Sequence, residues 1–78
     1  MRPIEIHHHA DGRVELLHGW PQRTRISLEL LESGGGNGIT LTQHPQDRLL
    51  VELPTTSALY RIVERQYAYV EAELIGKS

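Results

Sequence analysis

Three consecutive histidines are the residues of this chain best suited to metal chemistry. Alternate side chains of an extended strand point to the same face, so His7 and His9 share one face and His8 points to the other. Two imidazoles and a carboxylate can fill three positions around Zn²⁺ and leave the fourth for water. Glu15 supplies the carboxylate if the chain turns back after His9. The spacing therefore allows a Zn²⁺ site of His7, His9 and Glu15, and with it a small metal-dependent hydrolase.

The loop that follows the histidines decides whether Glu15 lies close to them. An Ala-Asp-Gly segment between alternating apolar residues is typical of a tight hairpin, with Gly12 free to adopt positive φ. A three-residue loop pairs His7 with Glu15 and His8 with Val14. A two-residue loop would set apolar residues opposite two of the histidines and mix the faces, so we expect the longer loop. One face of the hairpin then carries Ile4, Ile6, His8, Val14, Leu16 and His18.

The alternative interpretation of the histidine face is an ordinary solvated surface. His7 and Glu15 would then form a cross-strand charge pair that needs no ligand. An exposed hairpin face also offers no pocket, whereas binding sites for small molecules are concave. The chain contains no Cys, which excludes disulfides, thiolate metal ligands and thiol nucleophiles together. We therefore expect no cofactor, with Zn²⁺ as the alternative.

The serines and glycines of the chain lack the settings that nucleophiles and phosphate-binding loops require. No serine stands in a Gly-x-Ser-x-Gly elbow. The glycines within residues 34–38 are not followed by Lys-Ser or Lys-Thr, and the next segment has the pattern of a strand. These patterns predict a non-catalytic protein and leave hydrolysis at the histidine face as the enzymatic alternative.

The hydrophobic pattern predicts a single α+β domain over residues 1–78. Apolar and polar residues alternate between turn signals, which is typical of strands, and we expect strands over about 3–9, 13–18, 23–32, 38–43 and 48–53. Apolar residues at helical spacing then predict a helix over about 57–75 that ends near Gly76. This stripe consists of Leu59, Ile62, Val63, Gln66, Val70 and Leu74. The expected fold is an antiparallel five-stranded β-meander, two hairpins plus a central strand, packed against one C-terminal α-helix.

Aromatic and apolar residues at positions expected to be solvated indicate a protein partner. Tyr and Arg are enriched among the residues that anchor interfaces. The expected helix presents Tyr60, Tyr67, Tyr69 and Arg65, and the outer face of the expected sheet presents Leu17, Leu31 and Leu50. Single exposed apolar residues are normal, so an ordinary surface is the alternative interpretation.

We therefore predict a small non-catalytic protein–protein interaction module, an adaptor or inhibitor that binds a larger protein. A domain of 78 residues without disulfides has a small core, and self-association is one route to further stability, so we expect a homodimer. Small single-domain proteins of this kind include those encoded by phages and mobile elements, and we consider such an origin for this chain.

Charge and hydropathy argue against two other classes of partner. The net charge of −2 does not favour nucleic acid, although Arg23, Arg25 and Trp20 form a small basic and aromatic group. No segment approaches the roughly 18 consecutive apolar residues of a membrane span. The first residues also lack the apolar core of a signal peptide. We expect no nucleic-acid partner, no membrane partner and a cytoplasmic protein.

Overall fold

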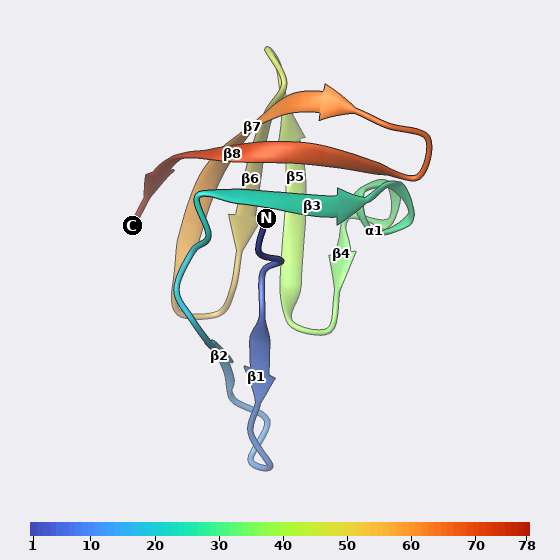
Figure 1. Ribbon diagram of the computed structural model, residues 1–78. Helices are drawn as coiled ribbons and strands as arrows, with labels where there is room; N and C mark the ends of the chain where they lie inside the picture. The colour runs from blue at the N-terminus through green and yellow to red at the C-terminus, as the bar shows by residue number, and fades with distance from the viewer.

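A strongly bent sheet of six antiparallel strands forms a half-barrel, and a separate two-stranded hairpin extends from it (Figure 1), as the computed structural model of the full chain shows. The strand order in the half-barrel is β3-β8-β7-β6-β5-β4. Its strands are β3 (Arg23–Ser27), β4 (Gly35–Gly36), β5 (Ile39–His44), β6 (Arg48–Glu52), β7 (Ser57–Arg65) and β8 (Tyr69–Lys77). The hairpin consists of β1 (Ile6–His8) and β2 (Val14–Leu16), and the helix is α1 (Leu28–Ser33).

The concave face of the half-barrel holds the hydrophobic core. Alternate residues of each strand point to this face, as the period of a β-strand requires. The register places Leu49 beside Tyr60 and Val51 beside Ala58, so inward-facing residues of neighbouring strands meet. The core consists of Ile26, Leu31, Leu41, Leu49, Val51, Ala58, Tyr60, Ile62, Val70 and Ala72. The chain thus forms one small domain around one core.

Two irregularities in the pairing of β7 with β8 let these long strands bend. The register shifts between Leu59 and Tyr60 and again between Ile62 and Glu64. An extra residue in one strand increases the local twist and bends the strand. In Figure 1, β7 accordingly starts beside β6 and ends in a direction close to that of β3. The bulges therefore turn a flat sheet into a half-barrel.

The predicted helix over 57–75 is wrong, because this region is the β7–β8 hairpin. Its inward residues follow a period of two on each side of the turn, with Ala58, Tyr60 and Ile62 buried in β7 and Val70 and Ala72 buried in β8. The apparent helical stripe mixed the two faces, because Ile62 and Val70 point inward, whereas Leu59 lies on the convex face and Val63 is the extra residue of a bulge. The fold is therefore mostly β, and the five-stranded meander with a C-terminal helix is corrected to the half-barrel.

The predicted strand over 23–32 ends at Ser27, where α1 begins. The Ser27 hydroxyl accepts a hydrogen bond from the Leu30 amide at 3.1 Å, which caps the first turn. Gly34 ends the helix with a φ of 79°, a left-handed conformation that favours glycine. Leu31 points into the core from this single turn and a half. No helix of the structure has the length and apolar character needed to cross a membrane.

The predicted hairpin around the histidines is confirmed in its register. Ile6 pairs with Leu16, His7 with Glu15 and His8 with Val14. Gly12 has a φ of 92°, as the expected loop required. We call residues 6–16 the arm, since they project from the half-barrel (Figure 1). The arm forms its own two-stranded sheet and shares no strand pairing with the half-barrel.

The second predicted hairpin is also confirmed. Strands β5 and β6 pair around the turn at residues 45–47, close to the expected bounds. Alternate residues of the hairpin point inward: Leu41, Leu49, Val51 and Leu53 are buried, and Ile39 is half-buried against the core. Here the alternation is regular, so the period of two was visible in the sequence.

Candidate functional site

The three residues of the predicted metal site lie on one face of the arm. The rings of His7 and His9 are 4.5 Å apart between centroids. The Glu15 carboxylate lies 2.8 Å from Nε2 of His9, rather than beside His7, its cross-strand partner. That hydrogen bond and the charge of His9 lower the pKa of Glu15. As the side chains stand, His9 and Glu15 are joined by a hydrogen bond, and no group of three or more such residues surrounds a common metal position.

Two of the residues expected to bind a partner are buried in the half-barrel. Tyr60 is completely buried, and its hydroxyl donates a hydrogen bond to the Pro21 carbonyl at 2.6 Å. Burial raises the pKa of Tyr60 to about 12. Leu31 is buried where α1 covers one end of the core. Neither side chain has surface to offer a partner, because each was assigned to a face of an element that does not exist in the fold.

The other five expected contact residues are dispersed over the surface. Tyr67 is fully exposed in the β7–β8 turn, and Leu17 is 51% exposed at the end of the arm. Arg65 lies near that turn and forms an ion pair with Asp47. Tyr69 is half-buried with the Arg25 guanidinium 4.6 Å from its ring centroid, and Leu50 is half-buried on the convex face of β6. Arg65, Tyr67 and Tyr69 thus lie at or beside the β7–β8 turn, whereas Leu17 and Leu50 lie on other elements.

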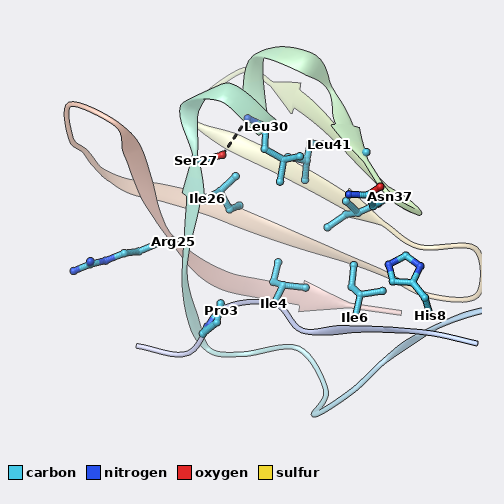
Figure 2. A pocket seen from close by; sticks show the side chains of 12 residues that line it. Pro3, Ile4, Ile6, His8, Arg25, Ile26, Ser27, Leu30, Asn37 and Leu41 are labelled. Carbon is cyan, nitrogen blue, oxygen red and sulfur yellow. Dashed lines mark hydrogen bonds between the residues drawn. The ribbon is translucent and has the colours of Figure 1, made fainter.

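An apolar pocket lies at the open side of the half-barrel, between β3 and β5, and it has a volume of about 270 Å³. Figure 2 shows Ile4 and Ile6 of the N-terminal segment on one side, with Ile26, Leu30 and Leu41 facing them. His8 and Asn37 lie together at one end of the pocket (Figure 2). Ile4, Ile6 and His8, predicted to share one face of the hairpin, all line this pocket, although His8 is exposed. His18, predicted on the same face, instead lies 2.8 Å from the carboxylate of Glu5. The pocket has the size of a few side chains and a mostly apolar lining.

The edge of the sheet beside this pocket is unpaired. β3 is the last strand of the sheet, and its other neighbour is β8. Gln22 and Leu28 bond to β8 through their backbone, so Thr24 and Ile26 also point their backbone groups toward β8. The backbone groups of the alternate residues Arg23, Arg25 and Ser27 therefore point away from the sheet. A free strand edge of this kind is a template for another extended chain. The opposite edge is β4, which is only two residues long.

A group of charged residues lies on the convex face next to this edge. Glu71 is nearly buried, with Arg25 at 3.3 Å and Arg23 at 3.8 Å from its carboxylate. Its cross-strand neighbour Glu64 forms a hydrogen bond with it, which lowers the pKa of Glu71. The same hydrogen bond and the charge of Glu71 raise the pKa of Glu64. Most of the negative charge therefore lies beneath the two arginines, whose own side chains are about half exposed.

Sequence reasoning missed the pocket and the free edge, although it placed several of their residues correctly. The alternation places Ile4 and Ile6 on one face of the first hairpin, and both line the pocket. A pocket remains where the inward side chains of two strands do not meet, and this depends on which strands are neighbours. The expected meander gives β3 a neighbour on each side, whereas in the structure β3 is the last strand of the sheet. The sequence does contain a local signal for the early end of β3. Ser27 is a favourable helix cap, and Leu28 and Leu31 follow it at helical spacing.

Comparisons with protein-family models, with curated proteins and with solved structures give no match. The candidate site therefore rests on its own geometry.

Proposed function

We propose that this protein is a non-catalytic module that binds an extended segment of a partner protein at the free edge of β3. The observation that carries this proposal is the apolar pocket of about 270 Å³ directly beside an unpaired strand edge. Backbone hydrogen bonds to a strand edge give affinity, and a pocket for an alternate side chain gives selectivity. The site thus offers both parts of a known mode of peptide recognition.

Two features support the edge of β3 over other surfaces. Its backbone groups at Arg23 and Arg25 have no partner strand, whereas β4 at the other edge is too short to template one. The pocket is lined by side chains that are only half-buried, such as Ile4 and Leu30, so an entering apolar side chain would cover them. Burial of this apolar surface would stabilise the complex by about 25 cal/mol per Å².

The test is selection of random linear peptides on the folded protein, followed by NMR mapping of the binders. We expect shifts in the amides of Arg25 and Ser27 and in the methyl groups of Ile26 and Leu41. Replacement Leu30→Trp fills the pocket and should abolish binding, while the control Leu59→Trp on the convex face should not. Binders that map to the arm or to the Tyr67 turn, and that tolerate Leu30→Trp, would refute the proposal.

A second pair of variants separates the contribution of the Arg25 backbone amide to binding from that of the Arg25 side chain. The amide of Arg25 points away from β8, so Arg25→Pro removes a donor that the fold does not use. Arg25→Ala keeps this donor and loses only the charge. If the edge binds the peptide, Arg25→Pro should weaken binding well beyond the effect of Arg25→Ala. Equal effects of the two variants would show that the backbone edge takes no part.

We propose divalent-metal binding at the arm as a second candidate function. The observation that favours it is the common face of His7, His9 and Glu15, with the two imidazoles 4.5 Å apart. A metal ion would replace the His9–Glu15 hydrogen bond, and these side chains lie at the surface, where they can turn. Calorimetric titration with Zn²⁺ should give 1:1 binding that is lost in the double variant His7→Ala/His9→Ala and retained in His44→Ala. Equal, weak binding in all three proteins would exclude the site.

A further inference from the structure

We infer that the segment bound at β3 is an acidic strand, in which acidic and apolar residues alternate. This inference rests on the proposed function and adds the chemistry of the partner. Its basis is the division of β3 into two faces: Arg23 and Arg25 are exposed on the convex side, while Thr24 and Ile26 are buried on the concave side. A strand added to this edge continues both faces of the sheet.

Residues of the incoming strand that lie beside Arg23 and Arg25 meet positive charge. The side chains of Arg23 and Arg25 are 46% and 58% exposed, and both form ion pairs with the carboxylate of Glu71. Glu71 lies one strand further in, on β8, and Glu64 lies beyond it on β7, so the two arginines of β3 are the charged residues of these strands nearest an incoming strand. Opposite charges in directly facing cross-strand positions stabilise a pair by about 0.2–1 kcal/mol.

Residues of the incoming strand that lie beside Thr24 and Ile26 point to the other face. There they continue the row of Ile26 and reach the pocket, whose walls are mostly apolar. Because side chains alternate along a strand, the pattern that satisfies both faces is acidic, apolar, acidic, apolar. A peptide with the same composition but with its acidic residues grouped together cannot satisfy both.

Charge complementarity also argues against a second copy of this chain as the occupant of the edge. A two-fold pair of β3 strands centred on Arg25 would set Arg25 opposite its own counterpart. Like charges in facing positions destabilise a strand pair, and charged residues are a common way to protect an edge from self-association. The arginines thus disfavour pairing of β3 with itself and favour an acidic partner.

Single-stranded nucleic acid is the other ligand that a positive edge could attract. The edge offers Arg23 and Arg25, but Tyr69, its one neighbouring aromatic ring, is occupied by Arg25. Nucleic acid would also leave the backbone donors and acceptors of β3 without strand partners. The unpaired edge therefore favours a peptide, and an oligonucleotide serves as a competing ligand in the test.

The experiment measures the affinity of four synthetic peptides of equal length by calorimetry. In three of them, valine alternates with glutamate, with lysine or with threonine. The fourth peptide has the same composition as the glutamate peptide, but all its glutamates lie at one end. We expect the alternating glutamate peptide to bind at least about ten-fold more tightly than the lysine peptide, and the grouped peptide to bind weakly. Added salt should reduce this preference, because exposed charges are screened.

Variants of the protein then locate the preference. Arg23→Gln/Arg25→Gln should reduce the glutamate-to-lysine ratio to about one, while Arg48→Gln, a matched change on the convex face of β6, should leave the ratio unchanged. Thermal unfolding of each variant shows whether it is folded. If Arg23→Gln/Arg25→Gln is unfolded, the single variant Arg23→Gln and the salt dependence of the wild-type protein test the same point.

The outcomes separate this inference from the proposed function. If all three alternating peptides bind equally and Arg25→Pro abolishes binding, the edge binds peptides but the acidic preference is overturned. If no peptide binds, both the proposal and the inference fail. If an oligothymidylate binds more tightly than every peptide, the edge is a nucleic-acid site and the inference is likewise overturned.

Discussion

The half-barrel and the arm are two sheets of one short chain that are held together by different forces. The half-barrel buries Leu49, Val51 and Val70 completely on its concave face. The arm has no fully buried residue, and its strands are three residues long. Its polar side-chain contacts lie at the surface, a hydrogen bond of His9 with Glu15 and an ion pair of Arg13 with Asp11.

This difference indicates which region carries the stability of the protein. Burial of a large aliphatic side chain contributes about 1.5–3 kcal/mol, whereas an exposed ion pair contributes about 0–1 kcal/mol. A two-stranded hairpin is at best marginally stable alone. We therefore expect the arm to depend on its contacts with the half-barrel, and the half-barrel to depend little on the arm.

The largest expected contrast is between one leucine in each region. Leu49→Ala should lower the free energy of unfolding by about 2–5 kcal/mol, because a completely buried side chain leaves a cavity. Leu16→Ala in the arm removes a half-buried side chain and should cost less than about 1 kcal/mol. Urea denaturation of both variants measures the difference. Equal losses would show that the arm is an integral part of the core.

Alanine variants of two glycines test which of the two regions is the more rigid. Both Gly35 and Gly38 have positive φ, so alanine is strained at either position, at about 1–3 kcal/mol. A methyl group at Gly35 would strike the Ile39 backbone, whereas one at Gly38 would lie 2.9 Å from a side-chain carbon of Val14 in the arm, which can move. Gly35→Ala should therefore be the more destabilising variant in thermal unfolding. The control Gly36→Ala meets no atom within 4 Å and should cost least.

A tyrosine pair tests the hydrogen bonds of core and surface. Tyr60→Phe removes the donor to the Pro21 carbonyl, which is buried and would lack a partner. An unsatisfied buried group costs about 1–3 kcal/mol. Tyr67→Phe, at a fully exposed position, should leave the unfolding midpoint unchanged. A loss of equal size in the two variants would contradict the assignment of Tyr60 to the core.

The carboxyl pair on the convex face should make stability depend on pH. The pKa of Glu64 is raised above its ordinary value of 4.5, so its unfavourable contribution is absent below pH 4.5 and grows as the pH rises through the raised pKa. Glu64→Gln keeps a hydrogen-bond donor to Glu71 and cannot ionise. It should therefore stabilise the protein at pH 8 and have little effect at pH 4. The exposed control Glu52→Gln should show no such change with pH in chemical denaturation.

The smallest effect is expected in the arm, at Glu15. Its pKa is lowered by His9, so its favourable contribution is present above pH 4.5 and is lost as the pH falls through the lowered pKa. Glu15→Gln should loosen the arm at pH 6 and change little at pH 3. Amide exchange in β1 and β2 measures this locally. A global change in stability would mean that the arm and half-barrel unfold together.

The same comparison explains which parts of the fold were predictable from the sequence. The arm and the β5–β6 hairpin are local structures, fixed by turn residues such as Gly12 and by regular alternation, and both registers were predicted. The β7–β8 hairpin was not, because extra residues at Val63 and Ile75 interrupt the alternation of its two strands. The tyrosines, valine and isoleucine of that segment favour strands, and this propensity was the signal to weigh against the helical spacing.

The candidate site depends on the part that could not be predicted. The pocket exists because β3 pairs with β8 and leaves its other edge free, and this pairing joins Arg25 to Glu71 across 46 residues. Turn chemistry says nothing about so distant a partner. The inward side chains were predictable one by one, but the opening that they leave between β3 and β5 follows only from the strand order.

The strand order also implies an order of folding. Strands β5 to β8 follow one another as hairpins with short turns, so their contacts close small loops, whereas β3 joins β8 only after a much longer loop has closed. Loop closure costs more entropy as the loop grows, and non-local pairing slows folding. We expect β3 to dock last and to detach first. A partner strand bound at the free edge of β3 would then slow the detachment of β3 and so lengthen the lifetime of the native state.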